Sequence, residues 1–358
     1  MPSPHAPTPN GRGAVTNRSG RYERDAREAF DDGWGVEDEA APKLTTTVTK
    51  ETARTIISRN TSPDIGFDRT INTYRGCEHG CIYCYARPNH AYAGLSPGLD
   101  FESKLFAKFN AAERLELELS AKNYRANVMV MGGVTDVYQP IERTHRITRA
   151  VLDVLGRYNH PVAMITKSAL ITRDIDLLAP MAAKNLAKVA ISITTLDRTL
   201  ARRMEPRAAT PQRRLDAIRA LAQAGIPVAV MTAPLIPGLN DAELEAILAA
   251  AADAGATEAG YVVLRLPLEI KDLFREWLEG AYPDRARKVI NLVREMRGGR
   301  DYDPEWGARQ RGTGPYARLI AGRFRKACAR LGLNRRKLDL DITQFRVPPR
   351  AGDQLDLL

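Results

Sequence analysis

The chain has few cysteines and no long apolar run, and both shortages exclude classes of protein. Only four cysteines and five histidines occur in 358 residues, which excludes a small scaffold held together by many disulfides. No apolar run approaches the roughly 20 residues of a transmembrane helix, and the N-terminus lacks the apolar stretch of a secretory signal. We therefore expect a cytoplasmic protein with reduced cysteines.

The excess of basic residues is local. The formal net charge is +10, and residues 309–350 contain twelve Lys or Arg against two acids, Asp339 and Asp341. Charge of one sign gathered in one segment favours a polyanionic partner. We therefore expect residues 309–350 to contact nucleic acid.

Three of the four cysteines lie in one short motif. Cys77, Cys81 and Cys84 form a Cys-x-x-x-Cys-x-x-Cys run inside residues 73–85. Soft thiolates this close together favour a metal centre. A four-iron cluster with three protein ligands would leave one iron open to another molecule. A zinc site is the alternative, with His79 or His90 as a further ligand, although no second Cys-x-x-Cys pair is present.

This spacing, with Tyr83 directly before the third cysteine, resembles the cluster motif of the radical S-adenosylmethionine (SAM) enzymes. The resemblance covers about residues 66–266. It implies one 4Fe-4S cluster held by the three cysteines, SAM on the open iron, and the ring of Tyr83 near the adenine. It also implies an electron donor such as flavodoxin or ferredoxin, and reductive cleavage of SAM to a 5′-deoxyadenosyl radical.

Short β-branched runs alternate with amphipathic stretches between residues 65 and 296. The expected strands are 70–74, 127–131, 162–166, 188–194, 228–233 and 260–264, and the expected helices are 111–122, 144–158, 173–184, 212–224 and 241–254. Strands that alternate with helices pair in parallel. We predict an α/β fold, a partial, six-unit parallel β/α barrel over residues 61–298, with a doubly wound open sheet as the alternative.

The flanking segments differ in composition from this alternating region. Residues 1–60 are rich in Pro, Gly, Arg and Asp, and we expect an N-terminal extension that is largely disordered, with an extension lying along the protein surface as the alternative. Residues 299–346 are expected to form a basic helical C-terminal region with an amphipathic helix at 316–331. Residues 347–358 are expected to be a flexible tail.

Polar residues follow the expected strands at their carboxyl ends, where parallel barrels carry active sites. Gly132 and Gly133 follow strand 127–131 and permit close backbone approach to a ligand. The resemblance places the amino group of SAM there, next to an acidic residue. This chain has Val134 at that point, so we assign the amino group to Thr135 and Asp136. A glycine turn with a helix cap is the alternative.

Four further side chains complete the predicted SAM site. Ser192 and Thr194 lie two apart on one strand and share a face, from which hydroxyls can bond the ribose. Arg203 could hold the SAM carboxylate in a bidentate fork, and Lys167 is its rival. Strand packing and a surface charge run are the alternatives for these residues. No catalytic residue is assigned.

Residues 135–140, a Thr-Asp pair followed by Tyr-Gln-Pro, are similar to the spore photoproduct lyase-like branch. This similarity implies a lyase-like, repair-type reaction on a base in DNA. Such chemistry uses a cysteine in the barrel as hydrogen donor, and none follows strand 162–166. The spare thiol, Cys328, is expected to be a buried helix residue. Radical modification of a peptide or small metabolite, and a metal-binding nucleic-acid adaptor without catalysis, stay open.

The last five residues resemble the short motif by which bacterial polymerases and repair proteins dock on the sliding clamp. They are Gln354, Leu355, Asp356, Leu357 and Leu358. A flexible peptide with apolar anchors can fill a preformed groove. We expect the bacterial sliding clamp as a partner, and the alternative is an ordinary apolar C-terminus.

Overall fold

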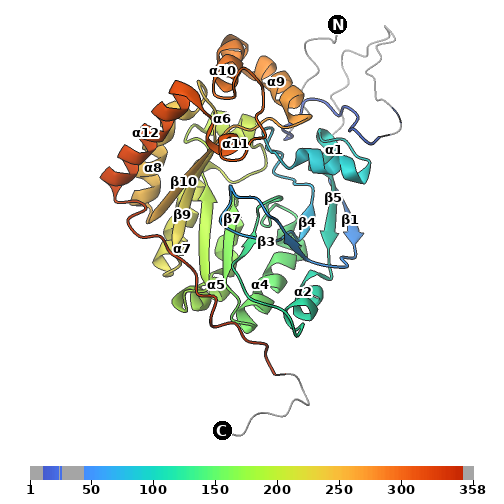
Figure 1. The fold of residues 1–358 in the computed structure, drawn as a ribbon. Helices are drawn as coiled ribbons and strands as arrows, with labels where there is room; N and C mark the ends of the chain where they lie inside the picture. Colours follow the sequence, from blue (N-terminus) through green and yellow to red (C-terminus); the bar gives the residue numbers. More distant parts are fainter. Residues whose placement is uncertain (1–10, 24, 26–43, 350–358) are drawn as a thin grey trace.

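A computed structural model describes residues 11–23, 25 and 44–349. Within these residues the larger sheet has seven strands in the order β10-β9-β8-β7-β6-β3-β2 (Figure 1). The strands are β2 (Ile57–Arg59), β3 (Arg69–Ile71), β6 (Met129–Met131), β7 (Val162–Thr166), β8 (Ala187–Ser192), β9 (Val228–Leu235) and β10 (Glu258–Val263). Strand β2 is antiparallel to β3, and the other neighbouring pairs are parallel.

The order of the strands confirms the predicted partial barrel. From β3 to β10 the parallel strands follow one another in chain order, whereas a doubly wound sheet reverses its order at a switch point. In the described part of the chain the edge strands β2 and β10 are not paired with each other, so the sheet stays open. Strand β7 has the predicted bounds, and the other parallel strands differ from the prediction by a few residues at their ends.

Amphipathic helices connect these strands and cover them. They are α2 (Ala111–Leu119), α4 (Ile147–Arg157), α5 (Ile175–Ala183), α7 (Pro211–Gln223) and α8 (Leu244–Asp253). Helix α4 shows why they form: Ile147, Val151 and Leu155 recur at helical spacing and are buried. Helices α5 and α7 pack against β8, and α8 packs against β9. The main apolar core lies between these helices and the sheet.

A second, smaller sheet brackets the cysteines. It contains β1 (Thr47–Glu51), β5 (Lys104–Lys108) and β4 (Tyr74–Arg75), in the order β1-β5-β4. Strands β4 and β5 are antiparallel, with Tyr74 opposite Ala107. They close the base of residues 76–103, which we call the cysteine loop and which include η1 (Arg87–Ala93) and α1 (Leu99–Ser103). Strands β1 and β5 of this sheet have no counterpart among the strands expected from the sequence.

The remaining helices lie around the carboxyl ends of the large sheet and along its outer face. They are α3 (Glu142–His145), η2 (Ala169–Asp174), α6 (Arg198–Met204), η3 (Asp241–Glu243), α9 (Ile270–Ala281), α10 (Pro283–Glu295), α11 (Ala308–Arg311) and α12 (Gly314–Leu331). Helix α12 confirms the helix predicted at 316–331, and it lies beside α8 in Figure 1. None of the described helices combines the length and apolar character needed to cross a membrane.

Where the structure describes the N-terminal extension, it follows the alternative of an extension that lies along the protein. Residues 11–23 pack against the cysteine loop, with the side chain of Arg12 buried, and residues 44–60 include two paired strands. Buried hydrogen bonds hold these residues, which explains why their polar composition did not leave them disordered. Residues 1–10, 24 and 26–43 lie outside the described residues, and so does the predicted clamp motif at 354–358.

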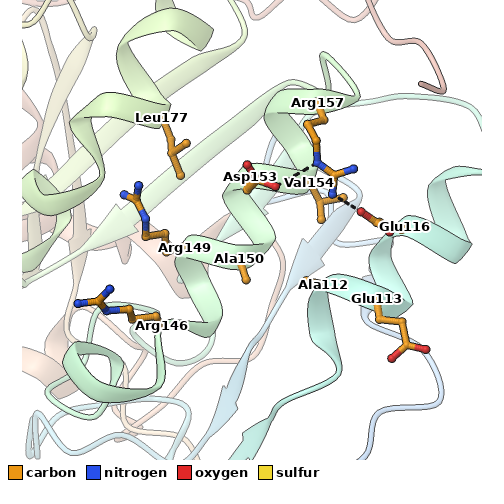
Figure 2. A pocket seen from close by; sticks show the side chains of 10 residues that line it. All are labelled: Ala112, Glu113, Glu116, Arg146, Arg149, Ala150, Asp153, Val154, Arg157 and Leu177. Atoms are coloured by element: carbon orange, nitrogen blue, oxygen red, sulfur yellow. Dashed lines mark hydrogen bonds and ion pairs between the residues drawn. The ribbon is translucent and has the colours of Figure 1, made fainter. Parts of the chain in front are cut away.

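A surface groove of about 570 Å³ lies between the helices α2, α4 and α5 (Figure 2). Ion pairs from Arg157 to Glu116 and Asp153 cross its wall. None of the predicted site residues lines this groove. The predicted site residues lie instead in the cysteine loop and near the strand ends.

Candidate cofactor site

Three successive turns shape the cysteine motif. The backbone N–H of Gly80 donates to Cys77 O at 3.3 Å, that of Cys84 to Cys81 O at 3.2 Å, and that of Arg87 to Cys84 O at 3.1 Å. Gly80 has a φ of +68°, a left-handed conformation that glycine adopts without strain. Cys77 and Cys81 are buried and Cys84 is partly buried. The turns therefore gather three thiols within one short stretch.

The electrostatics of these thiols fit a metal cluster. Burial raises the pKa of Cys77, and so do Asp136 and the two other cysteines nearby. Burial and the charge of Glu205 raise the pKa of Cys81 to about 12. Such thiols become ligands when bound cations stabilise the thiolates. All four cysteines are free of disulfide bonds, so the three in the motif can hold a cluster.

The histidines that a zinc site would recruit have other neighbours. Nδ1 of His79 lies 3.3 Å from Oδ2 of Asp136. The ring of His90 packs edge-on against Phe101 and Phe106. Among the described residues, no group of three His, Cys, Asp or Glu side chains is placed to hold a single metal ion. With both histidines packed against protein neighbours, the three thiols of the motif are the side chains that would hold a cluster.

Asp136 joins the end of β6 to the end of β7 and to the cysteine loop. Its Oδ1 accepts from the hydroxyl of Thr166 at 2.7 Å and from the N–H of Tyr138 at 2.9 Å. Its Oδ2 accepts from the N–H of Lys167 at 2.8 Å. Burial alone would raise the pKa of Asp136, but His79 and these donors hold it well below its usual range. Asp136 is thus a charged side chain whose two oxygens already have protein partners.

The residues around Asp136 also hold the cysteine loop. The hydroxyl of Thr135 donates to Tyr74 O at 3.0 Å. The amide of Gln139 accepts from the N–H of Glu78 at 2.8 Å and donates to Gly76 O at 3.2 Å. The segment predicted to bind the amino group of SAM therefore contacts the backbone on both sides of Cys77. These hydrogen bonds hold the backbone of the motif in place.

A buried polar network lies beside Tyr83. The carboxylate of Glu205 accepts from the hydroxyl of Tyr83, from Thr194 at 2.5 Å, and from the guanidinium of Arg214. Burial would raise the pKa of Glu205, yet Arg214 and the ammonium of Lys167 lower it to about 2. Lys167 lies 5.7 Å from the centre of the Tyr83 ring. Three of the predicted positions, Tyr83, Thr194 and Lys167, thus meet here.

The two glycines after β6 have different surroundings. Gly132 has a φ of +87°, and a Cβ there would lie 2.0 Å from Ile165 O. Glycine is therefore required by the packing of β6 on β7. A Cβ on Gly133 would lie 3.9 Å from the nearest atom, in Thr70, and its carbonyl accepts from the hydroxyl of Tyr85. Gly133 leaves room for a ligand, whereas Gly132 shapes the turn.

The two remaining expected SAM contacts differ in position, because Ser192 touches this network and Arg203 does not. Ser192 is buried at the end of β8, where its carbonyl accepts from Arg214 at 3.0 Å. The exposed Arg203 donates to Ala281 O at 3.0 Å and lies over the ring of Tyr282. Helix α6 packs Leu200 and Met204 against the cysteine loop, so Arg203 points to the α9–α10 junction. The structure does not bring Arg203 to the predicted site.

Sequence reasoning missed two buried ion pairs beside the motif. Glu205 pairs with Arg214, and Glu102 pairs with Arg87, and all four side chains are almost completely buried. Glu205 lies in the charged run 202–207, for which a SAM-binding arginine and a surface charge run were both open. The sequence does carry a signal for this burial. The apolar residues of α6 at 200, 201 and 204 fall on one buried face of the helix, next to Glu205.

The comparisons with known proteins agree with this geometry. The family model of the Radical SAM superfamily matches residues 71–251. The uncharacterized protein Rv2578c of Mycobacterium tuberculosis is 36% identical over 230 residues, which are 64% of this chain and 68% of that protein. The uncharacterized protein MJ0683 of Methanocaldococcus jannaschii is 28% identical over 229 residues, which are 63% of this chain and 81% of that protein.

Solved structures resemble the fold. Spore photoproduct lyase complexed with dinucleoside spore photoproduct superposes with a TM-score of 0.57 at 15% identity, over 80% of each chain. A point mutant of spore photoproduct lyase gives a TM-score of 0.56 over the same shares. At this level of identity the likeness shows the fold, and it confirms that the predicted resemblance extends to the architecture.

Proposed function

The chain belongs to the radical SAM superfamily and is a radical SAM enzyme, and we propose that its substrate is a base in DNA. The family match spans residues 71–251. The cofactors of this family are one 4Fe-4S cluster and SAM. When both are bound to the protein, they supply the one-electron cleavage of SAM. The chain's own residues hold, orient and shield these groups.

We assign the cluster to Cys77, Cys81 and Cys84. Replacing any one of them with Ala should abolish cluster binding and SAM cleavage, whereas Cys328→Ala should leave both intact. Cys328 lies on the buried face of α12 within the main core, where the Asn334 amide lies 3.8 Å from its sulfur. Iron and sulfide content of anaerobically reconstituted protein decides this, and full loading of the Cys81→Ala chain would contradict the assignment.

For SAM we propose a revised set of contacts. Lys167 becomes the cation that pairs with the SAM carboxylate. Its ammonium lies over the Tyr83 ring, and its charge lowers the pKa of the nearby Cys81 and Cys84 thiols relative to burial alone. Gly133, Ser192 and Thr194 remain proposed contacts at the strand ends. Lys167→Met should weaken SAM binding by roughly tenfold, about 1.4 kcal/mol, while Arg203→Met, the matched change outside the site, should not. Equal dissociation constants for the two variants and the unaltered chain would refute the revision.

The exposed basic surface is the observation that carries the proposal for DNA. Seven side chains project into solvent from α12 and the turn after it: Arg318, Arg325, Lys326, Arg330, Arg335, Arg336 and Lys337. Two other arginines of this region face inward, because Arg323 pairs with Glu245 and Arg309 pairs with Asp64. A surface of this kind binds phosphates by releasing counterions. The fold neighbour complexed with a dinucleoside photoproduct supports the same class of substrate.

DNA binding should therefore depend on α12 and on salt. Changing Arg325, Lys326 and Arg330 together to Gln should lower the logarithmic salt slope by about three if each contacts a phosphate. The matched control changes Lys122, Arg125 and Arg213, which are also exposed, and should leave the slope unchanged. If neither DNA nor RNA binds at low salt, radical modification of a peptide or small metabolite becomes the better hypothesis.

Turnover gives the direct test of the substrate. The enzyme is incubated anaerobically with SAM and a chemical reductant, and 5′-deoxyadenosine is measured with and without DNA carrying ultraviolet-damaged bases. A lyase-like repair reaction predicts that damaged DNA raises the yield and that the lesion is consumed. Equal yields with damaged DNA, undamaged DNA and no DNA would contradict a DNA-base substrate.

We propose that an acidic electron carrier, such as flavodoxin or ferredoxin, docks on α6. Its inner face packs on the motif, where the N–H of Ile82 donates to Met204 O at 3.0 Å. Arg198 and Arg202 are exposed on the other side, and a helix with side chains is about 10–12 Å across. Charge reversal to Glu at both should raise the KM for the carrier but not change turnover with dithionite. Unchanged KM values would refute this surface.

We also propose that the C-terminal pentapeptide recruits the sliding clamp. Residues 354–358 lie outside the described residues, so the proposal rests on the sequence motif alone. Short peptide docking is expected at micromolar affinity, about 8 kcal/mol. Titrating purified clamp against the intact chain and a chain lacking residues 354–358 tests it. Equal affinity for both, or none for either, would leave an ordinary C-terminus.

A further inference from the structure

A short N-terminal segment, residues 11–23, enters the cysteine loop, and we call it the strap. The N–H groups of Gly13 and Ala14 donate to the two carboxylate oxygens of Glu102, at 2.9 and 2.8 Å. The guanidinium of Arg12 donates to Glu102 O at 2.7 Å. One residue of the cysteine loop thus receives three hydrogen bonds from a segment about ninety positions away in the chain.

The same Glu102 carboxylate links the strap to the cysteine motif. It pairs with Arg87 at 2.5 Å, and both side chains are fully buried. Arg87 donates to the carbonyls of Gly80 and Cys81 at 3.0 and 2.9 Å, and it also reaches Pro97 and Gly98. A buried ion pair holds its geometry when its remaining donors and acceptors are satisfied. The strap therefore contacts the backbone of Cys81 through two side chains.

The strap fits with no spare room. A Cβ on Gly13 would lie 1.8 Å from Gly80 O, and a Cβ on Gly98 would lie 2.2 Å from Thr16 O. The side chain of Ala14 is fully buried in an apolar cluster with Cys81, Ile82 and Tyr83. The strap is therefore part of the wall around the second cysteine.

The far side of the strap is tied to other elements. The hydroxyl of Thr16 donates to Glu276 of α9 at 2.7 Å, and Arg18 pairs with the same carboxylate. The amide of Asn17 donates to Asp100 at 3.0 Å and accepts from its N–H at 2.9 Å. These contacts bridge the cysteine loop and α9, so the strap is held from both sides.

We propose that the strap and Glu102 are positioning residues for the cluster, which hold the cysteine loop in its cluster-binding form and cover Cys81. Coupling between two events is reciprocal. If the strap stabilises the bound cluster, the bound cluster must stabilise the strap by the same free energy. The inference rests on the cysteine assignment and not on the DNA substrate.

Two measurements on the full chain test this coupling, and neither contains SAM or DNA. The first is iron release from reconstituted protein to a chelator under anaerobic conditions. Gly13→Ala should release iron about tenfold faster, because the added methyl expels the strap. Gly322→Ala is the matched control, since a Cβ there meets nothing within 4 Å, and it should match the unaltered chain. Asn17→Ala, which keeps Gly13 and Glu102, should give a smaller increase.

The second measurement is hydrogen exchange in the peptide that contains Gly13 and Ala14. Exchange should slow by about tenfold, or 1.4 kcal/mol, when the cluster is bound to the unaltered chain. Equal exchange with and without the cluster overturns the proposal, and so does iron release from Asn17→Ala and Gly13→Ala at the unaltered rate. If Gly13→Ala does not fold, the Asn17→Ala and exchange results still decide. Failure of the cysteine assignment is distinguishable, because the unaltered chain would then bind no iron.

Discussion

Changing Asp136 to Asn tests whether this carboxylate positions the cysteine loop or waits for a ligand. The two side chains have the same shape, so the change leaves no cavity. Asparagine keeps one acceptor oxygen, whereas Asp136 accepts from the N–H of Lys167 on one oxygen and from Thr166 and Tyr138 on the other. One set of donors must therefore lose its acceptor and face an NH₂ group.

The magnitude follows from these contacts. A hydrogen bond to a charged group contributes roughly 1.5–3 kcal/mol, and a buried donor left unsatisfied costs roughly 1–3 kcal/mol. We expect Asp136→Asn to lower the free energy of unfolding of the metal-free chain by about 3 kcal/mol. Because the pKa of Asp136 lies below its usual range in the folded chain, its contribution is present above the unfolded value of about 3.9. The contribution is lost as the pH falls through the lower folded value.

Urea unfolding of the metal-free proteins measures the effect. The difference between the unaltered chain and Asp136→Asn should be constant from about pH 5 to pH 8 and shrink below about pH 4. The control is Asp176→Asn, whose exposed carboxylate pairs with Arg149 and should contribute less than about 1 kcal/mol. If Asp136→Asn unfolds at the same urea concentration as the unaltered chain, the positioning role is refuted and a ligand-binding role for the carboxylate is favoured.

Three further changes should separate structure from chemistry. Glu205→Gln leaves Arg214 buried without its partner and should lower the free energy of unfolding in urea by roughly 3–5 kcal/mol at pH 7. Because the pKa of Glu205 is about 2 in the folded chain, this difference should persist down to about pH 4.5 and vanish only near pH 2. Cys328→Ala should lower stability by about 1 kcal/mol while iron content stays unchanged, and lost iron would contradict its purely structural role. Burial lowers the pKa of His160 to about 4, so stability should fall between pH 6.5 and pH 4, by up to about 3 kcal/mol. His160→Gln should flatten that part of the pH profile, and an unchanged slope would show that His160 is not its source.

The parallel sheet could be predicted because its signals are local. Strand β7 reads as Val-Ala-Met-Ile-Thr at 162–166, a run of apolar and β-branched residues with helical patterns on both sides. The small sheet gave no such signal. Strand β4 has only two residues, Tyr74–Arg75, which is too short for any periodicity, and its pairing with β5 follows from the turns of the cysteine loop between them.

The candidate site could be predicted only in part, for a related reason. The three cysteines lie within eight residues of one another, so the motif is visible in the sequence. Partners of Glu205 come from the cysteine loop, the end of β8 and α7, and only packing decides which arginine reaches it. Arg203 and Arg214 both follow β8, but the apolar face of α6 sends the first outward and the start of α7 brings the second to Glu205.

Three buried carboxylates hold the cysteine loop, Glu102 from within it and Asp136 and Glu205 from the strands and helices around it. Asp136 follows β6 and faces His79, Glu102 belongs to α1 and pairs with Arg87, and Glu205 follows α6 and pairs with Arg214. An unpaired carboxylate this close to thiolates would oppose their ionisation. Glu102 and Glu205 each have a buried guanidinium partner that offsets part of their charge, and Asp136 lies beside His79 and accepts from three donors. The local motif therefore determines which atoms can bind iron, whereas these long-range pairs determine where the atoms lie, and a Cys-x-x-x-Cys-x-x-Cys run without such pairs would lack that support.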